Sequence, residues 1–229
     1  MILALAAAIA AAQVPAATCP DLVTPQAFVC RALQSSKAGD PESAASAFEQ
    51  AAAAQTSDEA EKARMWAAAG NMWIAANQPG KAAIALDKAL VGTGLQAEQR
   101  GEALLDRARA AEAQNDLKTA RSRVNEAART IFEDPFLWYF SAALAIREGD
   151  AMTAKTAIGK ALTLEPNNPT ILFEAGHVHH FAGDEAAARS YWSRAASADP
   201  NGKAGQAARE ALAMLSKPAN VQSEPAPTK

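Results

Sequence analysis

Residues 135–168 read PFLWYFSAALAIREGDAMTAKTAIGKALTLEPNN, and residues 169–202 read PTILFEAGHVHHFAGDEAAARSYWSRAASADPNG. The two segments have equal length, begin with proline and carry Gly-Asp at the same place. When they are aligned, alanine or glycine falls at the eighth, twentieth and twenty-seventh positions of both. Self-similarity at a fixed period indicates a repeat protein, in which each unit buries its apolar face against its neighbours.

The pattern extends back through three earlier units, which we place at residues 25–62, 63–100 and 101–134. The twentieth and twenty-seventh positions are alanine in all five units. Because about a quarter of the chain is alanine, ten such matches arise by chance on the order of once in a million. The fourth position holds Phe28, Trp66, Leu104, Trp138 and Leu172, and the twenty-fourth holds Phe48, Leu86, Val124, Ile158 and Trp192.

Turn residues divide each unit into two helices. They are Gly39-Asp40, Asn77-Gln78, Asn115-Asp116, Gly149-Asp150 and Gly183-Asp184. Glycine or asparagine ends a helix by taking up a left-handed backbone, and the following aspartate caps the next helix. Thr56 and Glu59 have the spacing of a capping box ahead of the second unit. The small side chains let the two helices approach closely, and the large ones fill the space between them.

This pattern resembles the tetratricopeptide repeat (TPR), most clearly in the last two units. The last unit carries Leu172, Gly176, Ala188, Trp192, Ala195 and Pro200 at the family's spacing. The resemblance covers about residues 25–202 and implies an all-α fold, a right-handed α-solenoid of five TPR-like helix-turn-helix repeats.

The sequence departs from the family pattern in two ways. The first three unit starts are spaced four residues more widely than the family's 34, through either an extra helical turn or longer connections. In addition, the polar side chains of Arg31, Arg107 and Ser141 stand at places that are usually apolar.

The segments outside the repeats have distinct roles. Residues 18–24 form an N-terminal segment. Residues 203–217 carry apolar side chains on one helical stripe, which predicts a C-terminal capping helix that closes the open end of the solenoid. Residues 218–229 are polar and contain proline, so we expect a disordered tail.

The composition excludes several classes of protein. With 25 acidic and 22 basic residues the formal net charge is −3, which argues against a nucleic-acid binder. Beyond residues 1–12 the sequence has no long apolar run, so we expect no membrane span in the mature chain. It also contains no GxSxG motif and no phosphate-binding glycine-rich loop. We therefore expect a protein that is not an enzyme and holds no cofactor.

Residues 1–17 have the pattern of a signal peptide, cleaved near Ala16 or Ala17, although no Lys or Arg precedes the apolar stretch. A membrane anchor is the alternative, but about twelve apolar residues fall short of a span. Export predicts a periplasmic protein. Cys19 and Cys30 would remain after cleavage and would form one disulfide in an oxidising compartment. Alternatively both are free thiols, with Cys30 packed as a small apolar residue.

The three histidines of the chain are clustered at His177, His179 and His180. His177 and His180 share a helix face with Glu174, which makes a surface metal site conceivable. We favour the alternative that His179 packs in the core while the other two are polar contacts in the groove. One helix rarely supplies a complete ligand set, so we expect no metal.

The resemblance to TPR proteins implies that a partner binds the concave face, which the first helix of each unit lines. Carried over to this sequence, the partner-binding residues are Asn71, Arg109, Phe136, Tyr139, Phe140, Phe173, His177 and His180, with Arg64, Glu102, Leu105 and Asp106 beside them. Rigid aromatic side chains suit a binding hot spot. Alternatively, Phe136 or Phe140 fills the seam between repeats. We weigh two functions: an adaptor that binds a peptide or protein on its concave face, and a structural or assembly subunit of a membrane-associated complex that binds through its outer faces and cap.

Overall fold

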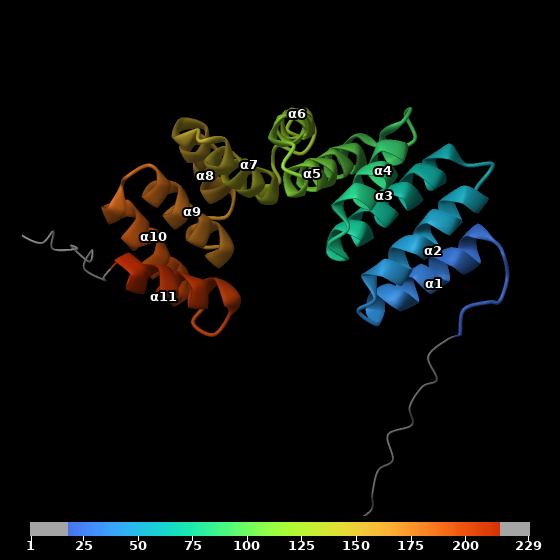
Figure 1. Cartoon of the computed structure of the whole chain (residues 1–229), viewed down its shortest axis with the longest axis horizontal. Coiled ribbons are helices and arrows are strands. Elements are labelled where there is room, and N and C mark those ends of the chain that lie inside the picture. The colour runs from blue at the N-terminus through green and yellow to red at the C-terminus, as the bar shows by residue number, and fades with distance from the viewer. Residues whose placement is uncertain (1–17, 216–229) are drawn as a thin grey trace, which may run out of the picture.

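The computed structural model describes residues 18–215 and consists, over that range, of eleven α-helices (Figure 1). They are α1 (Pro25–Lys37), α2 (Pro41–Ala54), α3 (Glu59–Ala75), α4 (Pro79–Leu90), α5 (Ala97–Ala113), α6 (Leu117–Ala127), α7 (Pro135–Glu148), α8 (Ala151–Leu164), α9 (Pro169–Phe181), α10 (Glu185–Ala198) and α11 (Lys203–Leu215). The prediction of an all-α solenoid is confirmed. The predicted signal peptide, the predicted tail and the last two positions of the predicted capping helix lie outside the described residues.

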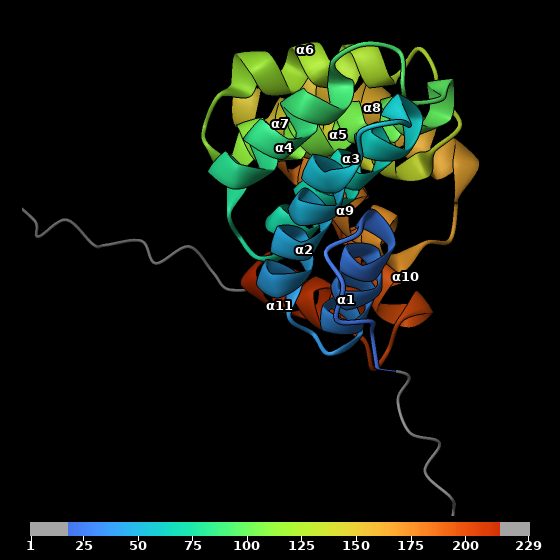
Figure 2. The ribbon, with the colours of Figure 1, turned by 90° about the vertical axis from the view of Figure 1, so that its right-hand side faces the viewer.

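Successive helices pair along the chain, and the pairs stack into an arch (Figure 1). Helix α3 contacts α5, and α7 contacts α9, so first helices of neighbouring units touch. Helices α4, α6 and α8 lie on the outer side of the arch. In the view turned by 90°, α1 and α11 both lie below α6 (Figure 2). The two arms of the arch therefore extend to the same side.

The small-residue positions of the repeat lie where paired helices meet. The alanines at the twentieth and twenty-seventh positions are at most 1% exposed in all five units. At the eighth position, a Cβ on Gly70 would lie 2.4 Å from Leu86 Cγ, and one on Gly176 would lie 2.2 Å from Trp192 Nε1. A larger side chain does not fit at these places, so the close packing of the helices accounts for much of the alanine in the chain.

The turn inside each unit has the same backbone form in all five repeats. The fifteenth position has a positive φ each time: Gly39 75°, Asn77 56°, Asn115 62°, Gly149 78° and Gly183 78°. Glycine and asparagine enter this left-handed region at the lowest cost. The predicted helix ends at these places are confirmed.

An aspartate after the turn caps the second helix of four units. Asp40, Asp116 and Asp184 each accept a hydrogen bond from the backbone N–H three residues on, and Asp150 accepts two. Hydrogen bonding lowers the pKa of all four carboxyl groups from its ordinary value. The caps therefore carry negative charge at helix N-termini, where it is favoured.

The wider spacing of the first units comes from an extra helical turn. Helices α3 and α5 begin at Glu59 and Ala97, four residues before the unit starts that we placed at Ala63 and Gly101. Each has 17 residues, whereas α1, α7 and α9 have 13 or 14. The N-cap of α3 is Asp58, which accepts a hydrogen bond from the Glu61 N–H. The capping box predicted from Thr56 and Glu59 is therefore wrong.

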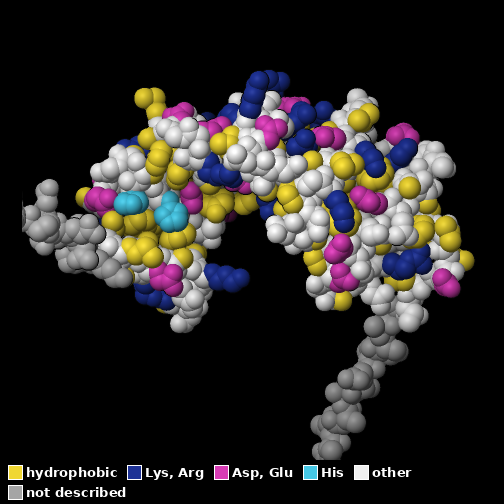
Figure 3. Space-filling model, in the orientation of Figure 1, with side chains coloured by type: hydrophobic (Ala, Val, Ile, Leu, Met, Phe, Trp, Pro, Cys, Tyr) yellow, Lys and Arg dark blue, Asp and Glu magenta, His cyan; other side chains and the backbone are white. Residues whose placement is uncertain are grey.

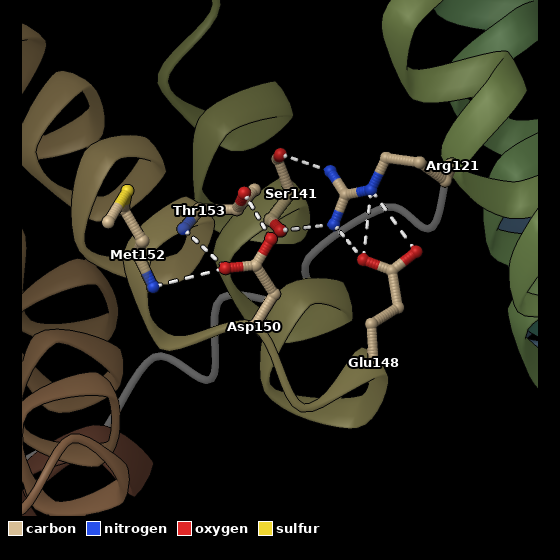
Figure 4. Close-up of polar contacts among 6 residues, drawn as sticks. All are labelled: Arg121, Ser141, Glu148, Asp150, Met152 and Thr153. Atoms are coloured by element: carbon tan, nitrogen blue, oxygen red, sulfur yellow. Dashed lines mark hydrogen bonds and ion pairs between the residues drawn. The ribbon is translucent and has the colours of Figure 1, made fainter.

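Polar side chains join neighbouring units at two of the places where the family pattern is usually apolar. Arg107 on α5 pairs with Asp87 on α4, with Nε and Oδ1 2.8 Å apart. The Arg121 guanidinium on α6 donates to the hydroxyl of Ser141 on α7 at 2.8 Å and pairs with the Glu148 carboxylate (Figure 4). Within the described chain, α6 and α7 share the smallest contact of any two consecutive helices. These polar contacts therefore strengthen the junction between α6 and α7, where consecutive helices of the described chain have the least contact.

Both ends of the described chain are held against neighbouring helices. The structure joins Cys19 and Cys30 by a disulfide, which holds the N-terminal segment against α1. Arg31 adds hydrogen bonds from its guanidinium to the carbonyl oxygens of Pro20 and Leu22. At the other end, α11 packs on α10 and α9, with Ala208 fully buried. Helix α11 thus occupies the capping position that we predicted.

We predict that the same substitution has opposite effects at two helical glycines. Gly176→Ala places its Cβ against the buried Trp192 ring and lowers the free energy of unfolding by about 1–3 kcal/mol. Gly159→Ala lies on the exposed side of α8 with no atom within 4 Å of its Cβ. It raises the free energy of unfolding by about 0.5–1 kcal/mol, because alanine is the better helix former. Equilibrium urea unfolding followed by circular dichroism measures both changes, and shifts of the same sign contradict the packing account.

Candidate partner-binding site

The inner side of the arch is hollowed between the two arms (Figure 3). We call the inner face formed by α1, α3, α5, α7 and α9 the concave groove. Its N-terminal part, between α1, α3 and α5, is a hollow of about 390 Å³. The lining includes Leu33, Phe48, Arg64, Asn71, Glu102 and Asp106. Four of these residues were predicted for the concave face from the repeat register.

A hydrogen-bonded bridge joins α3 to α5 across this part of the groove. The Asn71 amide donates to Asp106 Oδ2 at 2.8 Å, and Arg109 pairs with the other carboxylate oxygen at 2.8 Å. Two predicted binding residues thus share one carboxylate. They fix the wall of the groove, and the charge of Arg109 is largely neutralised within it.

An aromatic patch follows on α7. Phe136, which is 41% exposed, stacks on the half-buried Tyr139 with ring centroids 5.6 Å apart. The Arg109 guanidinium lies 5.5 Å from the centroid of the Phe136 ring. Burial raises the pKa of Tyr139, and the nearby Glu174 carboxylate raises it further, so its hydroxyl stays protonated at neutral pH. The patch offers flat apolar surface and a hydroxyl to a partner.

Phe140 is not part of this exposed surface. Its side chain is only 9% exposed and packs with Leu105, Leu137 and Leu144 in the core between α5, α6 and α7. Phe140 therefore fills the seam between repeats, as the alternative interpretation held, and its part in partner binding stays a prediction. Leu105, 4% exposed, belongs to the same core. Repeat register placed both on the inner helix face, but the core packing that α5, α6 and α7 share covers them.

Carboxylates gather beside the aromatic patch. Partial burial raises the pKa of Glu102, and the charges of Glu98, Asp106 and Asp134 raise it further. Glu98, Glu102 and Asp134 also line a second hollow of about 450 Å³, together with Glu133 and the exposed Phe132. That lining contains no Lys or Arg. The negative charge at this place is therefore not balanced by cations in the hollow itself.

Helix α9 carries the remaining predicted residues. The Phe173 and His177 rings lie 4.3 Å apart between centroids, and His177 also meets the edge of Trp192 at 5.7 Å. The side chain of His177 is 42% exposed. Hydrophobic side chains surround the histidines of α9 on this surface (Figure 3). Phe173, His177 and Trp192 therefore form an aromatic cluster between α9 and α10.

The other two histidines contact the turn and α10. His180 is exposed and its Nδ1 atom lies 2.8 Å from Glu185 Oε1. The ring of His179 stacks on Tyr191 with centroids 5.1 Å apart, and its Nδ1 atom lies 3.4 Å from an Asp184 carboxylate oxygen. Over residues 18–215 there is no group of three or more His, Cys, Asp or Glu side chains that could hold a metal ion.

Glu174 is the buried carboxylate of the groove floor. It is 7% exposed, lies next to Tyr139, and its carboxylate is 3.6 Å from His177 Nδ1. The sequence drew attention to Glu174 only as a metal ligand beside His177 and His180. Its position between α7 and α9 was not predicted, because it depends on how two helices from different repeats approach each other.

The sequence prediction also omitted Leu33 and Phe48. Leu33 is 51% exposed and lines the N-terminal hollow. It occupies the same place in the first unit as Asn71, Arg109 and His177 occupy in theirs. Extending the register to the first unit would have found Leu33. Phe48 belongs to a second helix, which the assumption of a lining built from first helices excludes.

Within residues 18–215, each helix is too short or too polar to span a bilayer. No protein-family model and no curated protein matches the sequence. Solved structures do match the fold. PilW, a widely conserved type IV pilus biogenesis factor, aligns with a TM-score of 0.67 at 17% identity over 80% of this chain and 81% of its own.

Two further structures match over similar lengths. PilF of Pseudomonas aeruginosa aligns with a TM-score of 0.67 at 16% identity over 85% of this chain and 83% of its own. YrrB, a TPR protein with an unusual peptide-binding site, aligns with a TM-score of 0.61 at 16% identity over 82% and 91%. The chain therefore has the tetratricopeptide-repeat fold, as its repeat pattern predicted.

We predict that alanine substitution lowers stability much more at Phe140 than at Phe136, although both phenylalanines lie on α7. Phe140→Ala leaves a cavity in the α5–α6–α7 core and lowers the free energy of unfolding by about 3–5 kcal/mol. Phe136→Ala removes a half-exposed ring and costs less than about 1 kcal/mol. Chemical denaturation of both variants tests this assignment. Equal losses of stability would show that Phe136 is also a core residue.

Proposed function

We propose that this protein is a non-enzymatic scaffold that binds a peptide or a segment of a protein in its concave groove. The observation that carries the proposal is the aromatic patch of Phe136 and Tyr139, which lies exposed on an inner helix beside a hollow. Large exposed aromatic side chains are typical of binding hot spots. Burial of these two rings under a bound partner explains why a chain with few aromatic residues keeps them at its surface.

The fold supports a binding function of this kind. Stacked repeats form extended concave surfaces that repeat proteins use to hold partners. The structural relative YrrB is described as having a peptide-binding site. The bridge of Asn71, Asp106 and Arg109 supports the proposal further, because it fixes the groove wall before a partner arrives. A wall that is ordered in advance lowers the entropy cost of binding.

A second candidate function is assembly through the outer face. Figure 4 shows Met152 at the start of α8, with Asp150 between it and the pair of Arg121 and Glu148. Met152 is 81% exposed and lines an outer hollow of about 730 Å³ together with Trp138 and Lys160. An exposed methionine beside an aromatic ring is an adaptable contact surface. This hollow favours a subunit that joins a membrane-associated complex through its convex side.

We further propose that the protein is exported to the periplasm of a Gram-negative cell. The apolar residues 1–12 followed by small residues have the pattern of a signal peptide. The disulfide between Cys19 and Cys30 supports the same proposal, since structural disulfides persist in oxidising compartments and are rare in the cytosol.

We predict that partner binding depends on the concave groove. Photo-crosslinking of exported proteins to the purified chain yields an adduct that Phe136→Ala reduces by about tenfold or more, because a hot-spot ring contributes at least about 2 kcal/mol to binding. The control is Met152→Ala, a truncation of a still more exposed apolar side chain on the outer face, which leaves the adduct unchanged. The reverse outcome, loss on Met152→Ala alone, would assign binding to the outer face and refute the groove proposal.

We predict that export and oxidation occur together. The full-length sequence, produced in a Gram-negative host, is recovered from the periplasm with its N-terminus just after Ala16 or Ala17 and with no reactive thiol. A chain that starts at Thr18 stays in the cytoplasm, where both Cys19 and Cys30 react with a thiol reagent. Its reduced form is less stable by up to about 2–3 kcal/mol. Recovery of uncleaved, reduced full-length protein from the cytoplasm would contradict the proposal.

A further inference from the structure

The charge of the groove is uneven along its length. On α5 and at the start of α7, Glu98, Glu102 and Asp134 lie near one another, since each of the other two raises the pKa of Glu102. The hollow that they line has no Lys or Arg in its wall. Arg109, which is close by, pairs with Asp106 instead. The carboxylates of this segment therefore face open space without a cation of the described chain to balance them there.

The uncompensated carboxylates lie next to the aromatic patch. Asp134 caps α7, and its Oδ1 atom accepts a hydrogen bond from the N–H of Phe136 at 2.8 Å. The Phe136 ring is 41% exposed, and that of Phe132, on the wall of the acidic hollow, is 57% exposed. Negative charge and exposed aromatic faces thus meet within a few residues of the chain. A guanidinium group satisfies both features, because it pairs with carboxylates and stacks on aromatic rings.

A buried acid adds to the negative charge further along the groove. Glu174 is 7% exposed, and its carboxylate lies close enough to the Tyr139 hydroxyl to raise the pKa of that group. Its nearest charged partner is His177, at 3.6 Å, which balances it only when the histidine is protonated. The negative charge of Glu174 therefore favours a partner that brings a positive charge to the region of Tyr139.

The geometry points to a partner of defined chemistry, and this step rests on the proposed groove function. We propose that the concave groove binds a peptide segment that places an arginine side chain in the acidic hollow, over Glu102, Asp134 and the exposed ring of Phe132. The same segment presents an apolar or aromatic side chain to Tyr139, in the direction of Glu174. An acidic segment would meet repulsion from these carboxylates and lose the stacking contact, so charge selects among partners that fit the same hollow.

Two labelled peptides of equal length test the proposal by fluorescence anisotropy. Both carry the same phenylalanines, and arginine residues in one are replaced by glutamate in the other. The arginine peptide binds, and the glutamate peptide binds at least about tenfold more weakly. Glu102→Lys weakens binding of the arginine peptide by about tenfold or more and strengthens binding of the glutamate peptide. Glu102→Gln has the smaller effect of the same sign, and circular dichroism confirms that each variant folds.

The matched control is Glu210→Lys on α11, which makes the same charge change on an exposed helix outside the groove lining. It leaves both affinities within about twofold. If the Glu102 and Glu210 variants changed the affinities equally, overall charge alone would explain the binding, and the proposal would be overturned. Equal binding of the two peptides, or no binding of the arginine peptide, would also overturn it. The groove function itself fails separately, when Phe136→Ala leaves the crosslinked adduct intact.

Discussion

Close approach of two helices within each repeat is the constraint on which the structure depends. The alanines at the twentieth and twenty-seventh positions are buried in every unit, and glycine or alanine at the eighth position leaves no room for a further atom. With the helix axes this close, large side chains such as Leu86 and Trp192 fill the remaining space beside the contact. The left-handed residue in each turn and the aspartate cap after it then give five helix pairs the same internal geometry. The groove exists because these similar pairs stack with their first helices inward.

Much of this fold follows from the sequence because the constraint is local. Helix ends are fixed by single residues such as Gly149 and Asp150, which act through their own backbone and side chain. The spacing of the repeats also indicated four extra residues before the second unit and four before the third. It did not distinguish a longer helix from a longer loop, since charged segments such as residues 59–62, Glu-Ala-Glu-Lys, suit either. The start of α3 was misplaced for a related reason: Thr56 and Asp58 are both good caps, and packing against the preceding unit decides between them.

The site was less predictable because it depends on contacts between repeats. Register correctly placed Asn71, Arg109 and Phe136 on the inner helix face. It did not show that Asn71 and Arg109 share Asp106, or that side chains of α5, α6 and α7 pack together to bury Phe140. The charge of a groove also depends on the folded structure, since Glu102 and Asp134 stand at opposite ends of the third unit and come together only when its two helices fold back on each other. Composition, with a net charge of −3, gave no sign of this concentration of carboxylates.

The seam between α6 and α7 has a mechanical consequence. The two termini of the described chain lie at opposite ends of the solenoid, so a bending motion of the arch passes through every junction in turn (Figure 1). Compliance is greatest at the junction with the least contact, and here that junction is held in part by Arg121, Ser141 and Glu148 rather than by apolar packing alone. Ion pairs weaken with ionic strength, whereas apolar contacts do not. The arch is therefore stiff within each half and softest near its middle, and the width between its arms is the dimension that salt can tune.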